Sequence, residues 1–255
     1  VAWLGGTYLI GETPTMAGYS WTFMLAFILT SIGLGMLLAV REPEPPARAQ
    51  RQRFLDRVKD IPALLREDPA FTRYFLARSL ATMGRMAMPF YILFAGENIG
   101  LDGFTLGVVT FAFTVSGTVS NLLWGMLADR KGFRLVFLLS ILLWVASTVL
   151  LMVSQELIIT LLVFIGIGAG VQGFQNASQN MTLEFGERRD LPIRIAVANT
   201  ASEIAGTVGP LLGGVLAAYL GYMAVFIASL AFLAVGSLVV AMHVPEPRHQ
   251  QKKLT

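Results

Sequence analysis

The basic residues of this chain gather in a few segments that alternate with long apolar runs. Of its 19 lysines and arginines, all but two lie in residues 41–73, 129–134, 184–194 and 244–255. The turns at the other ends of the runs carry no basic residue, and their acidic residues are Glu12, Glu97, Asp102 and Glu156. Short basic loops resist translocation and stay in the cytoplasm. The pattern therefore predicts an integral membrane protein whose basic turns and C-terminus are cytoplasmic.

Composition supports the same class of protein. The chain is 55% hydrophobic and only 14% charged, whereas soluble domains carry about a quarter charged residues. Its net charge of +3 does not indicate nucleic acid, because the basic residues flank apolar segments, where anionic lipid headgroups lie. The absence of cysteine excludes disulfides and thiolate chemistry. We find no phosphate-binding glycine loop, metal-ligand cluster or nucleophile constellation, so neither an enzyme, a metal nor a cofactor is expected.

Seven apolar stretches are long enough to cross the hydrocarbon core as helices, which takes about 20 residues each. They are residues 18–40, 70–95, 104–128, 135–153, 157–182, 193–219 and 221–242. Residues 1–10 resemble the outer end of an eighth. Single apolar runs cannot close a barrel, so the predicted fold is an all-α, polytopic transmembrane helical bundle.

Residues 41–69 form the one long connection, and residues 244–255 form a cytoplasmic tail. Within the connection, residues 54–66 place apolar side chains on one helical face and basic side chains on the other. This spacing is typical of a helix on the headgroups, although Pro62 interrupts it and a solvated linker is the alternative. Asp68-Pro69 is a good N-cap and first-turn pair for the next helix.

Three short motifs occur twice in the same order: Leu-Gly-Gly, Gly-Tyr and Pro-Glu-Pro. The first series runs from Leu4 to Pro45, and the second from Leu212 to Pro247. Parallel repeats joined by a cytoplasmic linker are a transporter architecture. We therefore expect residues 70–243 to be one complete six-helix half, and residues 1–40 to be the end of another half.

The turn after the third span reads Gly-Met-Leu-Ala-Asp-Arg-Lys-Gly-Phe-Arg from Gly125 to Arg134. The order Gly-x-Leu-Ala-Asp-Arg-x-Gly-x-Arg resembles the loop signature of the major facilitator superfamily. The resemblance implies twelve helices in two halves. It makes residues 70–243 helices 7–12 and residues 1–40 the end of helix 5 with helix 6. The remaining N-terminal half would then be a missing partner, and this chain part of a longer protein.

In that family the signature aspartate meets a helix N-terminus across the interface between the halves, supported by arginines. The resemblance therefore gives Asp129, Arg130 and Arg134 the role of a cytoplasmic gate. Gly125 and Gly132 complete the motif, and Gly132 can adopt a positive φ in the tight turn.

A second glycine motif lies at Gly209-Pro210-Leu211-Leu212-Gly213-Gly214. It resembles the Gly-Pro-x-x-Gly-Gly core of the family's antiporter motif, although that motif belongs in helix 5 and this copy lies in helix 11. A structural reading is also open, because small residues, Gly206 included, let helices approach closely and Pro210 bends the helix.

Polar residues inside the spans are costly in hydrocarbon and therefore informative. The fifth span carries an amide stripe at three- and four-residue spacing, which consists of Gln172, Gln175, Asn176, Gln179 and Asn180. Asn121 and Asn199 lie on neighbouring spans. These residues either line a cavity for a polar or amphiphilic solute or hydrogen-bond the helices together.

Glu203 is the only acidic residue inside a span, and Arg78 and Arg85 are the only basic ones. Counted along their helices, Glu203 lies about 15 Å deep, between Arg78 at about 13 Å and Arg85 at about 24 Å. An ion pair is therefore plausible by depth. Three interpretations compete: Glu203 carries protons, an arginine binds an anionic group of the substrate, or the charges are structural.

Together these features predict a secondary active transporter of small molecules that works by alternating access, by proton-coupled efflux. A proton or another ion would supply the energy, and the location would be a bacterial inner membrane. A non-transporting receptor or scaffold relative is the alternative, and a channel is a third possibility.

Overall fold

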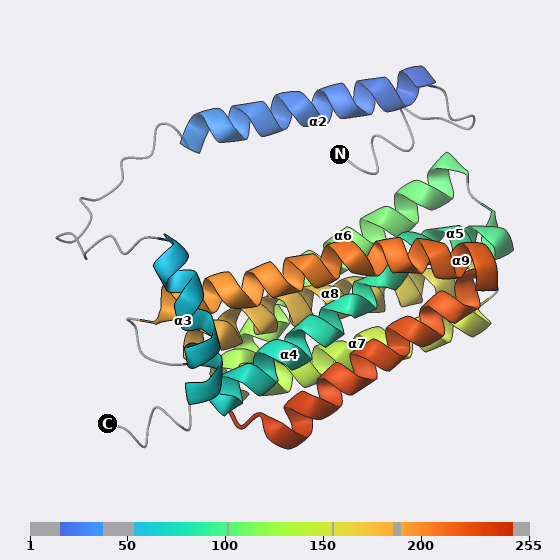
Figure 1. Cartoon of the computed structure of the whole chain (residues 1–255). Helices are drawn as coiled ribbons and strands as arrows, with labels where there is room; N and C mark the ends of the chain where they lie inside the picture. Colours follow the sequence, from blue (N-terminus) through green and yellow to red (C-terminus); the bar gives the residue numbers. More distant parts are fainter. Residues whose placement is uncertain (1–15, 38–53, 101, 155, 186–189, 247–255) are drawn as a thin grey trace. The chain divides into compact units, whose positions relative to one another are not determined.

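The structure, a computed structural model, describes residues 16–37, 54–100, 102–154, 156–185 and 190–246 (Figure 1). Residues 60–100 and 112–246 form one compact unit. The helix α2 (Met16–Leu37) and the first residues of α6 belong to a second unit. The expected partial helix at residues 1–10 and the expected tail beyond Glu246 lie outside the described residues.

The described part of the chain is helical and contains no strand, which confirms the all-α prediction. The expected spans correspond to helices α2, α6 (Gly103–Lys131), α7 (Phe133–Val153), α8 (Leu157–Glu184) and α9 (Leu191–His243), and to a broken helix between α2 and α6. Among the described helices, α6, α7, α8 and α9 are each long and apolar enough to cross a membrane.

The last helix, α9, contains both of the final two expected spans. Gly221 interrupts it with φ 78° and ψ 173°, a backbone conformation that L side chains rarely adopt. At this point the chain reverses direction, so that α9 has an outgoing arm, orange in Figure 1, and a returning arm, red. The predicted boundary between the two spans near Leu220 is thus confirmed.

The first span of the compact unit is broken, although residues 70–95 were expected to form one helix. It consists of α4 (Pro69–Met83), the 3₁₀ turn η2 (Gly84–Ala87) and α5 (Met88–Ile99). Pro89 lacks an N–H and its ring would clash with the carbonyl of Arg85 in a regular α-helix. The Ser229 hydroxyl donates to the Gly84 carbonyl at 2.7 Å, which satisfies one acceptor at the break.

A helix, α3 (Phe54–Glu67), is formed in the long connection and contains Pro62. The Asp68 side chain accepts a hydrogen bond from the Phe71 N–H at 3.0 Å, with Pro69 in the first turn of α4. The predicted cap of α4 is therefore confirmed. The position of α3 on a lipid surface stays a prediction.

Within the compact unit, α7 packs along α8, and α4 packs along α9 (Figure 1). Its buried centre is aromatic: Trp144, Tyr91 and Phe226 are at most 2% exposed. Trp144 donates to the Tyr91 hydroxyl at 2.9 Å, so the polar atoms of these rings have partners. The exterior is apolar as well, with Leu122 and Val153 more than 70% exposed. An apolar exterior is what a lipid-facing surface requires.

The two ends of this unit differ in charge. At one end Arg194 pairs with Asp68, and Arg134 donates to the Ala241 carbonyl. At the opposite end Asn98, beside Glu97, donates to the Ser154 carbonyl between α7 and α8. We call these the basic end and the acidic end. The sorting predicted from the sequence is thus present in the described residues 60–100 and 112–246.

Candidate functional site

Arg78 lies at the centre of a polar network that joins three helices. It projects from α4 and is only 6% exposed. Its guanidinium donates to Thr182 Oγ1 on α8 at 2.9 Å and to Asn199 Oδ1 on α9 at 2.9 Å. Both acceptors are neutral. Because a buried charge is costly unless it is solvated by polar groups, this network fixes the orientation of the three helices around Arg78.

Tyr74 extends this network by one turn toward the basic end. Its hydroxyl donates to the Ser178 carbonyl and lies 3.3 Å from Thr182 Oγ1. Its side chain is fully buried. Thr182 in turn donates to the Ser178 carbonyl of its own helix at 2.9 Å. Thr182 therefore positions both Arg78 and Tyr74, a role that the sequence did not suggest because isolated threonines in spans usually bond to their own backbone.

Glu203 lies on the exposed face of α9 and lines a cavity of about 550 Å³. The other lining residues are Asn199, Thr200, Ile204, Thr207 and Val208. All are spaced three, four or five residues from Glu203 or from one another, so they share one side of the helix. Asn199 both lines the cavity and accepts from Arg78. It is the link between the cavity and the buried network.

The ion pair that depth made plausible does not form between Glu203 and either Arg78 or Arg85. Arg78 is held by Thr182 and Asn199. The guanidinium of Arg85 lies against Gly206, where an added Cβ would be 3.1 Å from its Nη1. Glu203 is exposed, and its carboxylate is not within ion-pair distance of Arg78 or Arg85.

The second glycine motif makes that close packing possible. A Cβ at Gly209 would lie 3.3 Å from the Met83 carbonyl, and one at Gly213 would lie 2.7 Å from the Met86 carbonyl. Gly214 faces open space, with no atom within 4 Å of an added Cβ. Gly209 and Gly213 therefore admit the broken span α4–η2 to the α9 backbone, and Pro210 lies inside α9 between them.

The amide stripe on α8 does not form a single solvent-facing row. Asn176 donates to Asn121 Oδ1 of α6 at 3.4 Å, and Asn180 donates to Asn176 Oδ1 at 2.7 Å. Gln172 and Gln175 are half-buried, whereas Gln179 is exposed. The bond from Asn176 to Asn121 supports the interhelical interpretation for that pair. Asn199 belongs to the separate Arg78 network.

The loop signature occupies the turn between α6 and α7 at the basic end. Gly132 has φ 89°, as predicted, and an added Cβ would collide with the carboxylate of Glu246. Arg134 donates through Nη2 to the Ala241 carbonyl at 2.6 Å and through Nε to the Val240 carbonyl at 3.4 Å. Arg134 therefore caps the C-terminal end of α9, where a cation is favourable.

The remaining signature residues lie at the end of α6. Asp129 and Arg130 are exposed, and an added Cβ at Gly125 would meet no atom within 4 Å. Their side of the turn is thus accessible to another element of the protein. Among the described residues, no group of histidine and acidic side chains could hold a metal ion.

An ion pair at the same end was not found by sequence reasoning. Arg194 Nη1 lies 2.6 Å from Asp68 Oδ2, and the guanidinium carbon lies 4.8 Å from the centre of the Phe71 ring. The two charged residues are 126 positions apart. No local pattern in a single sequence reports a contact over that separation.

Long apolar helices around a buried arginine network, with basic turns sorted to one end, define a polytopic integral membrane protein. A family model described as Major Facilitator Superfamily matches residues 74–255. The chain belongs to this superfamily of transporters. A search of curated proteins found no match. Membership of this superfamily implies that the protein lies in a lipid bilayer and has a small-molecule substrate.

Proposed function

We propose that this chain is part of a secondary active transporter that exports small molecules by alternating access, driven by protons. The observation that carries the proposal is the cavity face of α9, where Glu203 and Asn199 lie one turn apart. A carboxylate within a span is costly in hydrocarbon and is retained where it serves a solvated path. The cavity's volume of about 550 Å³ is within the range of small-molecule sites.

The link from Asn199 to Arg78 suggests how a proton at Glu203 would influence the helices. Protonation removes the negative charge one turn from Asn199, which accepts from Arg78. The Arg78 network joins α4, α8 and α9, so a change at Asn199 acts on the three helices that surround the arginine. In this proposal Arg78 serves orientation and coupling, and Glu203 carries the proton.

The exposed side of α9 continues beyond the cavity with large apolar side chains. Leu211 is 68% exposed and Val215 is 55% exposed. We propose that an N-terminal half of the same protein, to which residues 1–40 belong, covers this face and completes the cavity. We also place the basic end and the C-terminus in the cytoplasm of a bacterial inner membrane, as the positive-inside rule requires. Transport assays therefore use the product of the complete reading frame.

Glu203→Gln is expected to abolish the dependence of transport on a pH gradient while leaving substrate binding intact. Glutamine keeps the size and hydrogen-bonding capacity of the side chain but cannot carry a proton at neutral pH. The measurement is substrate flux in proteoliposomes with and without an imposed pH gradient. Thr200→Val is the matched control, because it changes the same cavity without altering charge. A Glu203→Gln protein whose flux still follows the pH gradient would refute the proton-carrier role.

Asp129→Asn is expected to slow transport about tenfold or more without affecting membrane insertion. A tenfold loss of rate corresponds to an increase of roughly 1.4 kcal/mol in the activation barrier. The reason is that the proposed gate requires a carboxylate to meet a helix N-terminus of the other half. Flux and the amount of inserted protein are measured together. Lys131→Gln tests a neighbouring exposed charge of the same turn and should leave flux unchanged. Normal flux in the Asp129→Asn protein would rule out the gate.

A further inference from the structure

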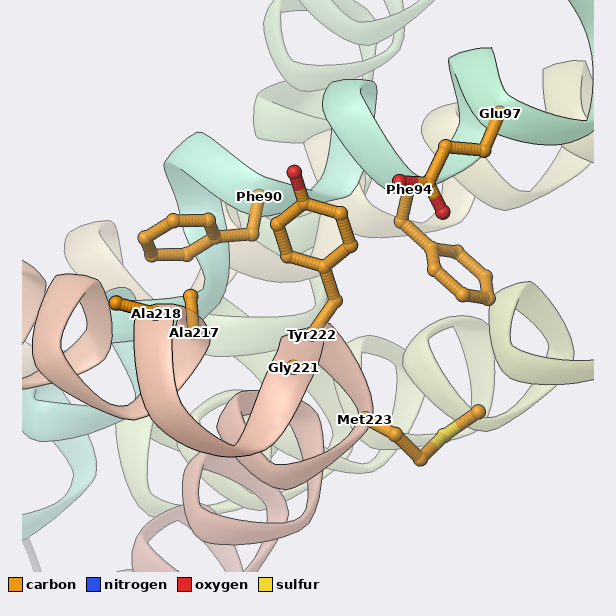
Figure 2. A pocket seen from close by; sticks show the side chains of 8 residues that line it. All are labelled: Phe90, Phe94, Glu97, Ala217, Ala218, Gly221, Tyr222 and Met223. Atoms are coloured by element: carbon orange, nitrogen blue, oxygen red, sulfur yellow. The ribbon is translucent and has the colours of Figure 1, made fainter.

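A second cavity, of about 560 Å³, lies at the acidic end of the compact unit. Its lining comes from one face of α5 and from the turn between the two arms of α9 (Figure 2). The lining residues are Phe90, Phe94, Glu97, Ala217, Ala218, Gly221, Tyr222 and Met223. Gly221 and Glu203 are separated along α9 by roughly 27 Å at 1.5 Å per residue. The acidic-end cavity is therefore distinct from the cavity at Glu203.

Three aromatic rings form the apolar part of this cavity. Figure 2 shows the Tyr222 ring between Phe90 and Phe94. The ring centres of Phe90 and Tyr222 are 5.9 Å apart with a 35° tilt, and those of Phe94 and Tyr222 are 6.5 Å apart at 85°. Phe94 also packs edge-on against the buried Phe226, at 5.2 Å. Phe94 is thus held against the core, and the negative potential of aromatic ring faces attracts a cation.

Glu97 supplies the only charge of the lining. It follows Phe94 by three residues on the same face of α5, and Figure 2 shows both side chains among those that line the cavity. Its side chain is exposed, with no ion pair in the described part of the chain. No lysine or arginine occurs between Arg85 and Arg130, or between Arg194 and Arg248. The α5 and α9 segments that build this cavity therefore bring no basic residue to neutralise Glu97.

We propose that this cavity binds an organic monovalent cation with apolar substituents. The ring faces attract the positive charge, the small and apolar lining accepts the substituents, and Glu97 adds direct electrostatic attraction. The volume suits a drug-sized molecule rather than a metal ion. An anion of the same shape would be repelled by Glu97. This inference goes beyond the proposed transport function, because it assigns a ligand class to a site away from Glu203 and requires no proton coupling.

The test measures binding of tetraphenylphosphonium by calorimetry to the purified protein in nanodiscs of phosphatidylcholine. Tetraphenylborate, of nearly the same shape but with a negative charge, serves as the reference ligand. After subtraction of the heats measured with empty nanodiscs of the same lipid, we expect the cation to bind and the anion not to bind. Glu97→Gln should weaken cation binding about threefold to tenfold. Tyr222→Leu should weaken it by a similar factor, because it removes one ring, and Tyr222→Phe should retain binding.

Glu156→Gln is the matched control, since it removes one carboxylate at the acidic end outside the cavity. Its phosphonium affinity should equal that of the unmodified protein. Equal loss in Glu97→Gln and Glu156→Gln would show only a general surface charge effect and would overturn the proposal. Equal binding of phosphonium and borate, no binding of phosphonium, or full affinity in Glu97→Gln would overturn it as well. Glu203→Gln should bind phosphonium normally, so this result stands apart from the outcome for proton coupling.

Discussion

A Gly170→Leu substitution is expected to separate α7 from α8 and to destabilise the compact unit by about 3 kcal/mol or more. A Cβ at Gly170 would lie 2.8 Å from both the Ser140 carbonyl oxygen and the Trp144 backbone nitrogen. Both atoms belong to the backbone of α7, so they cannot yield by a side-chain rotation. The helices must move apart, and the buried contacts of Trp144 are lost with them.

Two quantities are measured in detergent: the thermal unfolding midpoint, and the fraction of protein that remains monodisperse on heating. Gly170→Ala and Gly214→Ala form a matched pair, because both replace a helical glycine by the same residue. An added Cβ at Gly214 meets no atom within 4 Å, so this variant should gain up to about 1 kcal/mol from helix propensity. Similar midpoints for the two alanine variants would contradict the close approach at Gly170.

Asp68→Ala is expected to have the second largest effect, a loss of about 2–4 kcal/mol. Its Oδ1 accepts from the Phe71 N–H at 3.0 Å, and its Oδ2 pairs with Arg194 at 2.6 Å. The substitution removes the cap of α4 and leaves Arg194, whose side chain is only 7% exposed, without its carboxylate. The Nε atom of Arg194 already has no hydrogen-bond partner, so the remaining charge would be poorly solvated.

Two further variants divide this loss into its parts. Asp68→Asn keeps a good N-cap but removes the charge, so it should lose only the ion-pair contribution. Asp102→Ala removes the acceptor of the Thr105 N–H, 2.6 Å away at the start of α6. It should lose only a cap, about 1 kcal/mol. Chemical or thermal unfolding in detergent gives the three values. If Asp68→Ala costs no more than Asp102→Ala, the pair with Arg194 contributes nothing.

Several local features followed directly from residue type and spacing. Asp68-Pro69 predicted the start of α4, and the glycine of the basic turn predicted the positive φ found at Gly132. The boundary at Gly221 was expected from the end of one apolar run and the start of another. These features depend on interactions within a few residues, so tertiary context does not change them.

The break in the first span was missed for a physical reason. Hydropathy measures the transfer of side chains from water and does not report backbone geometry, so residues 70–95 look continuous. Gly84 and Pro89 were the available signals. Their effect also requires the returning arm of α9. Leu233 occupies the space beside Gly84, and the Ser229 hydroxyl donates a hydrogen bond to the Gly84 carbonyl.

The sequence alone predicted which segments are apolar enough to span a membrane, which turns lie at the same end, and at what depth the charged groups lie. Depth is set by counting residues along a helix of known rise. The tertiary structure decided the partners, because contact also depends on how each helix is rotated about its axis. Close packing at Gly206, Gly209 and Gly213 brings the broken span against α9, while Glu203 stays exposed. Arg78 therefore meets Asn199 instead of Glu203.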